Sequence, residues 1–423
     1  MTTIRELFST RRPIDRPIEK VIDYQAADGD RLRAEVEEYE VTANIERSLQ
    51  RFVEAYGQGV RTGQVTEIGI WVSGFYGSGK SSFTKYLGFA LDADKMVDDR
   101  SFCDLLCERL PATGLRAELR TLTQQQPTSV ILLDLGAEML ASNAAEPVAN
   151  VLYWKTLRWA GYSMEKKLAE LELKLEQKGL LEKFRELYRA KFADEWEKVH
   201  DDPLSGVARA AQFVTELLPE DFPTPESFRS LRFDLTRSVQ DLVRTMVEIV
   251  RRRSGRQNIL FLIDEAGQYV AQRSELLLNL DGLARTLKEI GQGRIWIACT
   301  GQQTLSEVIQ SQALNALQLG ALKDRFPIAI DLEARDIREI TYKRLLTKSP
   351  EGEKRLREEF GRTGQALVNH TRLTGTKLFS GDPSADEFRQ FYPFLPQHFD
   401  LLLELIRNLA RTTSGIGLRS PFG

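Results

Sequence analysis

The chain has 423 residues, with 58 Lys and Arg against 61 Asp and Glu, so its net charge is −3. This length predicts two or three domains with a large core, and the near-neutral charge gives no support for binding nucleic acid by bulk electrostatics. No apolar run approaches the roughly 20 residues that span a bilayer, the N-terminus lacks a signal-peptide core, and the three cysteines and three histidines show neither a disulfide framework nor zinc spacing, so we expect a cytoplasmic protein without membrane association.

Residues 1–64 are predicted to form an N-terminal extension. Thr42 is the expected N-cap of a helix, because its side-chain oxygen can accept from an unpaired backbone N–H of the first turn. Four apolar residues would share one face of this helix: Ile45, Leu49, Phe52 and Val53. Three glycines are expected to break the helix before the next strand: Gly57, Gly59 and Gly63.

Residues 68–91 carry the most informative motif of the chain. A short apolar run at 68–73 predicts a buried parallel strand, and apolar residues recur at helical spacing over 82–91. Between them stands G-x-x-x-x-G-K-S, the phosphate-binding P-loop, in which Lys80 would reach the β and γ phosphates and Ser81 would hold Mg²⁺. The alternative is a glycine-rich turn without nucleotide. The predicted nucleotide-binding residues are Gly74, Phe75, Tyr76, Gly77, Ser78, Gly79, Lys80, Ser81 and Ser82.

The glycines of this motif let the backbone curl so that its N–H groups face phosphate oxygens. The N-terminus of the following helix adds a partial positive charge. Further along, Cys103 and Cys107 lie one helical turn apart, and we expect buried helix residues here and not a metal pair. Residues 130–135 predict a second apolar strand.

Residues 150–230 depart from an alternating strand–helix pattern. Apolar residues step by three and four along two stretches, and most other positions there are Glu or Lys. We predict two long amphipathic helices, a hairpin inserted into the core that packs either on its own domain or against a partner as a short coiled coil. A helix over 233–253 follows and ends in three arginines. Cations favour a helix C-terminus, and a DNA contact is the alternative.

Residues 258–265 form an apolar strand that ends in two acids. Such a strand is expected in the centre of the sheet, and α/β sheets bind ligands at the carboxyl ends of their strands. Asp264 would coordinate Mg²⁺, directly or through water. Glu265 would accept a proton from the attacking water or orient it. A lone Asp would also suit a kinase or a small GTPase, whereas Asp followed by Glu favours ATP hydrolysis.

Residues 293–303 predict a third buried strand, whose polar end could present Thr300 or Gln302 to the γ-phosphate or the water; ordinary strand termination is the alternative. Arg325 ends a helix before the strand at 327–332. It is placed to act as an arginine finger on a neighbouring subunit, where it would stabilise charge on the transferring phosphoryl group. The finger requires a homo-oligomer, and a helix-end cation without catalytic duty is the alternative.

Residues 335–423 predict a wholly helical lid after the last strand, in the manner of AAA+ or STAND-type ATPases. Such lids place a γ-phosphate-sensing arginine at the start of a late helix. Arg419 is the candidate, Arg411 is its rival, and a solvated surface cation is the alternative. Because the chain stops at Gly423 as that helix should begin, the lid is expected to be truncated and the chain to be the N-terminal piece of a longer protein.

The predicted fold is therefore α/β: a P-loop NTPase core of AAA+ or STAND-like type with a parallel sheet over residues 65–334, a helical insertion at about 150–230 and a C-terminal helical lid. The order of several sequence blocks resembles the BrxC/PglY family, the large ATPases of BREX bacteriophage-defence systems. The blocks that carry this resemblance are residues 4–8 with 16–18, 37–42, 71–83, 263–265, 300–303 and 392–396. The P-loop block is common to P-loop NTPases, and only the order of all blocks indicates this family.

The resemblance implies a cytoplasmic, Mg²⁺-dependent ATPase that uses ATP rather than GTP. It also implies work with other BREX components, a methyltransferase and a PglZ-like protein among them, on phage DNA reached through the complex. Family members are much longer, so contacts made by their C-terminal part cannot be assigned to these residues. A nucleotide-loaded scaffold that recruits partners with little turnover is the second hypothesis, and a DNA remodeller such as a helicase loader is the third.

Overall fold

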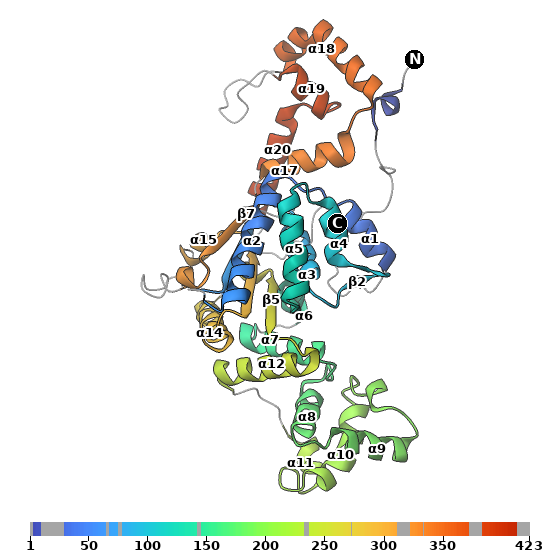
Figure 1. Cartoon of the computed structure of the whole chain (residues 1–423), viewed down its shortest axis with the longest axis vertical. Helices are drawn as coiled ribbons and strands as arrows, with labels where there is room; N and C mark the ends of the chain where they lie inside the picture. Colours follow the sequence, from blue (N-terminus) through green and yellow to red (C-terminus); the bar gives the residue numbers. More distant parts are fainter. Residues whose placement is uncertain are drawn as a thin grey trace.

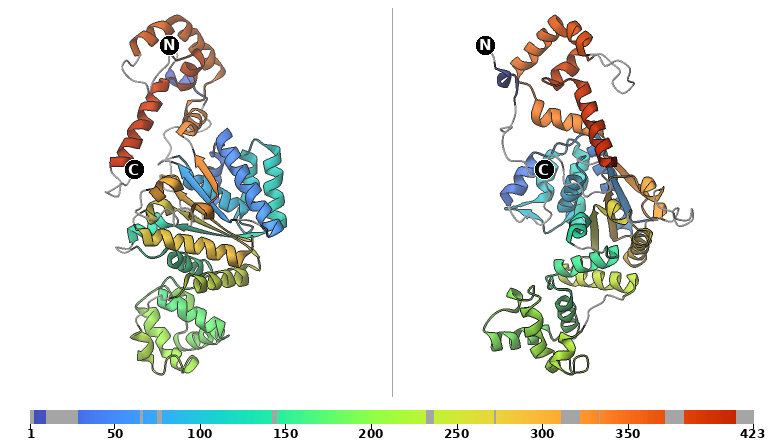
Figure 2. Two further views of the ribbon diagram at one scale, coloured as in Figure 1. Left: turned by 90° about the vertical axis from the view of Figure 1, so that its left-hand side faces the viewer. Right: turned by 180° about the vertical axis from the view of Figure 1, so that it is seen from behind.

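The computed structural model describes residues 3–9, 29–64, 67–74, 78–141, 145–231, 237–271, 273–310, 322–332, 334–371 and 383–412. In all three ribbon views an α/β core lies in the middle of an elongated molecule (Figure 1; Figure 2). The helices that follow the last strand lie at one end, and helices α8 to α11 lie at the other. The order of these parts along the long axis differs from their order in the sequence, because the insertion at α8 to α11 interrupts the sequence of the core.

The core is a five-stranded sheet in which every strand pair is parallel. Its spatial order is β4-β5-β6-β1-β7, and β1, β5 and β6 are buried along their whole length, as their uninterrupted apolar runs predict. All carboxyl ends therefore lie at one edge. The strands are β1 (Gly69–Gly74), β4 (Thr128–Asp134), β5 (Asn258–Asp264), β6 (Ile295–Gly301) and β7 (Ile328–Leu332).

Helices cover both faces of the sheet (Figure 2). Helix α3 (Lys80–Leu91) contacts β1, β4, β5 and β6. It forms one group with α2 (Ala43–Thr62), α4 (Phe102–Arg109) and α5 (Thr113–Gln125). The second group consists of α7 (Val148–Trp159), α12 (Val239–Ser254) and α14 (Ser274–Gly291). The α/β class predicted from the sequence is confirmed. Short elements complete the core: α1 (Gly29–Glu37), β2 (Met96–Val97), β3 (Arg100–Ser101), α6 (Leu135–Ala141), α13 (Ala266–Val270) and α15 (Leu305–Gln310).

Helix α2 confirms the predicted cap and the predicted end at Gly63, but not a break at Gly57 or Gly59. The Thr42 hydroxyl accepts from Ile45 N at 3.1 Å, and the four predicted face residues are buried. Gly57 and Gly59, however, lie inside the helix, which ends only at Gly63 with φ of 66°. A Cβ on Gly59 would come within 2.5 Å of the Trp296 ring, so this glycine permits a close helix–sheet contact and the expectation of a break there was wrong. Cys103 and Cys107 are buried in α4, as predicted.

The insertion forms several short helices, and the expectation of two long ones was wrong. They are α8 (Lys166–Gln177), α9 (Leu181–Phe192), the 3-10 helix η2 (Trp196–Lys198), α10 (Ser205–Leu217) and α11 (Pro225–Arg229). Gly179, with φ of 69°, separates α8 from α9, and Ala193, in the left-handed region, ends α9. The aromatic stripe then folds back on itself, and Phe184, Tyr188 and Trp196 are buried in a core separate from that of the sheet.

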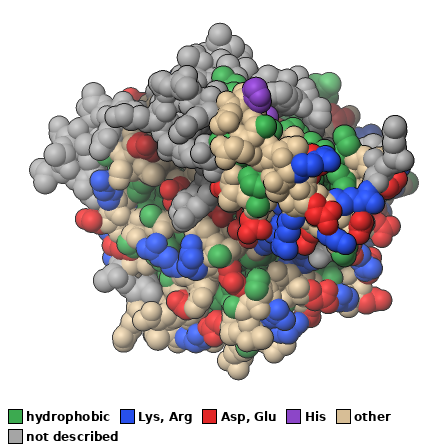
Figure 3. Space-filling model, turned by 90° about the horizontal axis from the view of Figure 1, so that it is seen from above, with side chains coloured by type: hydrophobic (Ala, Val, Ile, Leu, Met, Phe, Trp, Pro, Cys, Tyr) green, Lys and Arg blue, Asp and Glu red, His purple; other side chains and the backbone are tan. Residues whose placement is uncertain are grey.

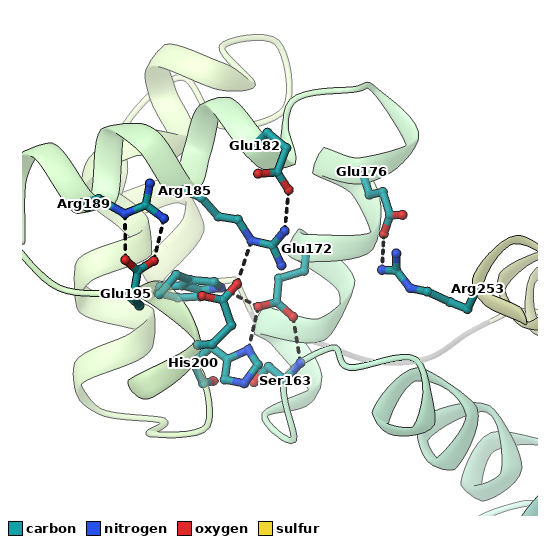
Figure 4. A network of polar contacts seen from close by, with 11 residues as sticks. Ser163, Glu172, Glu176, Glu182, Arg185, Arg189, Glu195, His200 and Arg253 are labelled. Carbon is teal, nitrogen blue, oxygen red and sulfur yellow. Dashed lines mark hydrogen bonds and ion pairs between the residues drawn. The ribbon is translucent and has the colours of Figure 1, made fainter. Parts of the chain in front are cut away.

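A buried carboxylate organises this second core (Figure 4). Glu172 accepts from Ser163 N at 2.7 Å and from Trp196 Nε1 at 2.5 Å, and lies 2.9 Å from His200 Nδ1. The hydrogen bond to Glu172 raises the pKa of His200. The predicted arginine run at the end of α12 contacts the same insertion, because Arg252 and Arg253 both pair with Glu176 of α8. These arginines therefore fasten the insertion to the core.

The described chain after β7 consists of helices joined by short connections. It comprises α17 (Ala334–Thr341), the π-helix η3 (Tyr342–Leu346), α18 (Pro350–Thr371), α19 (Ala385–Phe391) and α20 (Pro396–Thr412). Their small core contains Leu356, Phe388 and Leu395, and the 3-10 helix η1 (Ile4–Leu7) packs on α18. Viewed from this end of the molecule, basic and acidic side chains are interspersed on the coloured surface (Figure 3). Across the part of the chain that is described, every helix is too short or too polar to cross a membrane.

Candidate nucleotide site

The P-loop motif joins β1 to α3 at the carboxyl edge of the sheet. Gly79 is the N-cap of α3 and has φ of 87°, in the left-handed region that favours glycine. A Cβ on Gly74 would come within 2.5 Å of Ser78 Oγ and 3.0 Å of the Leu332 carbonyl oxygen. Gly79 is thus required by its φ, and Gly74 by the lack of space for a Cβ. Phe75, Tyr76 and Gly77, which were predicted to bind nucleotide, lie outside the described residues.

Two polar side chains of the motif are buried in a way that a ligand would explain. Ser78 Oγ is buried and has no hydrogen-bond partner among the residues that the structure describes. Lys80, the first residue of α3, is only 6% exposed. Burial lowers the pKa of Lys80, and the carboxylates of Glu265 and Asp264 act in the opposite direction. The lysine of the P-loop and the acid pair of β5 therefore interact, although 184 residues of sequence separate Lys80 from Asp264.

The acid pair is oriented by Thr300 at the end of β6. Its hydroxyl donates to Asp264 Oδ1 and accepts from Glu265 N at 3.0 Å. Glu265 has φ of 59° and is the N-cap of α13, a conformation that non-glycine residues adopt at a cost of about 1–3 kcal/mol. Because the Thr300 hydrogen is used on Asp264, Thr300 would position the acids and not donate to a phosphate. Gln302 follows at the carboxyl end of β6 and is half-buried.

Burial raises the pKa of Glu265 to about 7, and the neighbouring Asp264 adds to this effect while Lys80 opposes it. A carboxyl group with this pKa can exchange a proton near neutral pH. Asp134 contributes to the same shift. It ends β4, directly opposite Asp264 in the strand register, and a Cβ on Gly136 would lie 3.1 Å from Asp134 Oδ1 and 3.2 Å from Glu265 Cγ.

Asp134 is not among the site residues predicted from the sequence. The signal was present, because the predicted strand at 130–135 contains this acid near its carboxyl end and neighbouring parallel strands end at one edge. Asp134 Oδ1 accepts from Gly136 N at 2.9 Å and Ala137 N at 3.2 Å, so the residue also caps α6. The site thus holds three carboxylates rather than two.

The residues present fit a magnesium–triphosphate. Mg²⁺ prefers hard oxygen ligands and usually takes one or two from protein, with phosphates and water completing its shell. Asp264 at the end of β5 and Ser81 in the first turn of α3 are the residues that would supply protein oxygens to it. The unpaired buried Ser78 Oγ and the first-turn amides of α3, which include that of Ser82, would face the phosphates.

Arg325 lies at the other edge of the sheet, near the amino end of β7. Its guanidinium pairs with Glu67 at 3.0 Å and with Asp281 at 3.6 Å, and its carbonyl oxygen packs against Gly69 at the amino end of β1. In this conformation Arg325 is neutralised within its own chain and remote in the fold from the P-loop. Its role toward a neighbouring subunit stays a prediction. Arg419 lies outside the described residues, as does the side chain of Arg411.

Replacing Arg325 with alanine is expected to lower the free energy of unfolding by about 1–2 kcal/mol, because Asp281 loses an ion pair and Glu67 keeps only that with Lys288. Urea unfolding would measure this. Arg362→Ala, which removes an exposed pair with Glu359, is the control and should change stability by less than about 0.5 kcal/mol. Unchanged stability of Arg325→Ala, with turnover lost only at high protein concentration, would instead support action on a neighbour.

The class of protein that the fold defines is a doubly wound α/β protein with a five-stranded parallel sheet and polar residues gathered at its carboxyl edge. A scan of the chain against protein-family models found no match.

Proposed function

We propose that the chain is an ATP-binding, Mg²⁺-dependent ATPase module with a P-loop core of AAA+ or STAND-like type. The observation that carries the proposal is that one edge of a single parallel sheet brings together Lys80, which follows β1, and the acid pair, which ends β5. The two carboxylates oppose the lowering of the Lys80 pKa by burial. The strand order adds support, since β6 lies between the P-loop strand β1 and the acid-bearing strand β5. This arrangement puts Thr300 where it can orient both acids.

In this proposal the protein contributes mainly positioning and charge stabilisation. The first-turn backbone amides of α3 and the Lys80 ammonium would hold the phosphates. A magnesium ion, when bound, would neutralise charge on the β and γ phosphates. Glu265 takes the proton of the water that attacks the γ-phosphorus. Thr300 holds Glu265 in place through the backbone N–H of Glu265 and holds Asp264 through its carboxylate. Raised by burial to about 7, the pKa of Glu265 is suited to this transfer at neutral pH.

An assay of phosphate release from ATP and Mg²⁺ over a range of protein concentrations tests the proposal. We expect turnover that depends on Mg²⁺, and a rate per chain that rises with concentration if subunits complete each other's sites. No binding of ATP at millimolar concentration would refute the proposal. The assay is repeated with GTP, because the motif alone does not distinguish the two nucleotides, and with DNA.

A nucleotide-loaded scaffold is the second candidate, and the separate core of the insertion favours it. This part lies at the far end of the molecule from the lid helices (Figure 1), and a body with its own core can bind a partner without altering the sheet. The scaffold predicts ATP bound to the purified chain with little phosphate release. Sustained turnover would exclude it.

The resemblance to BrxC/PglY proteins extends the proposal to a cytoplasmic role in a BREX phage-defence complex, with a methyltransferase and a PglZ-like protein as partners. DNA would then be reached through the complex. A DNA remodeller would need a basic face of its own, and several basic residues of the lid helices are paired with acids, such as Arg355 with Glu351 and Arg389 with Glu353. Salt-dependent DNA binding by the chain alone would favour the remodeller.

A further inference from the structure

The first described residues of the chain bind to the helices at the other end of the sequence. Helix η1 and the two residues after it lie against the start of α18 (Figure 1), and Phe8 forms an antiparallel bridge with Lys348. Three hydrogen bonds join the segments: Ser9 N to Thr347 O (2.8 Å), Ser349 N to Leu7 O (3.0 Å) and Ser349 Oγ to Glu6 O (3.0 Å). The contact is made largely by backbone groups, so its register is fixed.

Helix α18 has a glycine where the segment approaches most closely. A Cβ on Gly352 would lie 2.2 Å from the Leu7 carbonyl oxygen, a distance that no real side chain tolerates. Gly352 lies in the first turn of α18, where its N–H donates to Ser349 Oγ at 3.0 Å, and the approach of the Leu7 backbone explains why a residue without a side chain stands here. The same helix contains Gly361, whose Cβ would meet nothing within 4 Å.

Phe8 covers a buried ammonium. Lys348 is 5% exposed, its Nζ lies 4.5 Å from the centroid of the Phe8 ring, and it donates to the Gln390 carbonyl oxygen at 3.2 Å. Cation–π attraction of this kind is stronger where water is excluded. The segment is therefore tied through Lys348 to the end of α19 as well as to α18.

The contact is specific but shallow. Helix η1 has no fully buried residue, and Ile4 is 59% exposed. Leu7 packs against the small cluster of the lid, in which Leu356, Phe388 and Leu395 are the buried members. Segments with few buried apolar contacts open at a lower free energy than the rest of a protein. The segment can thus leave the lid without unfolding of the sheet.

The point of attachment is the junction between the core and the lid. Residues 347–352 directly follow the π-helix η3, and π-helical turns often occur at functional sites. On the core side of η3, Asp336 of α17 is buried and accepts from Thr42 Oγ1 at 2.5 Å and from Asn44 Nδ2 at 2.8 Å. Helix α17 is thus fixed to the core, whereas α18 packs on α19 and on the N-terminal segment.

We propose that residues 4–9 form a detachable latch that holds α18 and sets the position of the lid helices relative to the core. Latch docking is independent of nucleotide. The further effect on ATP affinity rests on the proposed function, because a lid in one position binds nucleotide better than a lid that samples several.

Gly352→Ala in the full chain tests the latch, with Gly361→Ala as its matched control. Both changes add a methyl group to α18, Gly352→Ala in its first turn and Gly361→Ala in its interior, but only the first collides with Leu7. We expect hydrogen exchange at the Ser9 and Ser349 amides to become at least about tenfold faster in Gly352→Ala and to stay unchanged in Gly361→Ala. Equal protection in the two variants would overturn the proposal.

Phe8→Ala is a second test, because it leaves α18 unaltered and so separates loss of the latch from a disturbance of α18 by the methyl group added in Gly352→Ala. This change lies in the latch itself and removes a half-buried ring outside the helix, so the same two amides should again exchange faster while the amides of β5 keep their protection. Normal exchange at Ser9 and Ser349 in Phe8→Ala would contradict the latch.

The effect on the site is measured separately as the KM for ATP. We expect at least about a threefold increase in Gly352→Ala and none in Gly361→Ala. An unchanged KM would overturn the effect of the latch on the nucleotide site. Whether the latch docks on α18 would still be decided by hydrogen exchange. If the unaltered chain does not bind ATP, the proposed function fails, and hydrogen exchange still decides whether the latch exists.

Discussion

Replacing Lys80 with alanine is expected to weaken binding of ATP and Mg²⁺ by about 10- to 100-fold and to abolish turnover. Hydrogen bonds to charged groups contribute about 1.5–3 kcal/mol each, and Lys80 is buried at the start of α3, where water does not screen its charge. The fold should survive the change, because burial already lowers the pKa of this lysine and so disfavours its charged form.

Titration with a fluorescent ATP analogue measures the affinity. Lys183→Ala is the control, since this lysine is exposed on α9 of the insertion, and it should bind as the unaltered chain does. The variant offers a second readout, because Lys80 opposes the rise in the pKa of Glu265; its loss should raise that pKa further. Unchanged affinity in Lys80→Ala would refute the phosphate-binding role of this loop.

The elements of the site that could be predicted from sequence are those with short-range signals. Gly79 and Lys80 belong to a contiguous motif, and the strands at 258–264 and 295–301 are uninterrupted apolar runs that fit a buried parallel sheet. Asp264 and Glu265 could be placed at the carboxyl edge because every strand of such a sheet ends there. The N-cap at Thr42 depended on one side chain and its own first turn.

The parts that could not be predicted depend on contacts between distant segments. Gly59 lies within α2 because of the ring of Trp296, which no local pattern indicates. The apolar residues of the insertion fit two long helices, yet the chain folds back after α9 and Trp196 donates a hydrogen bond to Glu172. Asp134 joins the site only through the strand order, which places β4 beside β5. In each case tertiary packing outweighs local propensity.

Replacing Glu265 with glutamine is expected to leave ATP binding intact and to slow turnover by about 10²- to 10⁴-fold, the usual contribution of a positioned general base. Glutamine keeps the size of the side chain but cannot accept the proton. Turnover of the unaltered chain should also rise with pH between about 6 and 8, as the carboxyl group with a pKa of about 7 ionises. Single-turnover phosphate release, at saturating ATP, measures both effects; normal turnover in Glu265→Gln would remove this residue as the base.

The same substitution should stabilise the fold at alkaline pH, which gives a readout that needs no activity. The pKa of Glu265 is raised from 4.5 to about 7, so between these values the folded chain binds more protons than the unfolded chain. Stability from this group is therefore present below pH 4.5 and is lost as the pH rises through 7. The full shift would correspond to about 3 kcal/mol, and access of water to the half-buried carboxylate reduces it to about 2 kcal/mol.

Glu265→Gln should consequently exceed the unaltered chain in stability by about 2 kcal/mol at pH 8 and by little at pH 5. Urea unfolding at the two pH values measures the difference, and Asp92, whose pKa is raised to about 6 by burial elsewhere in the core, cancels because both proteins contain it. A gain at pH 8 together with lost turnover would indicate that the charge of Glu265 is maintained against the stability of the fold. Equal stability at both pH values would mean that Glu265 is solvated like a surface acid, and the argument for a base with a pKa near neutral would fail.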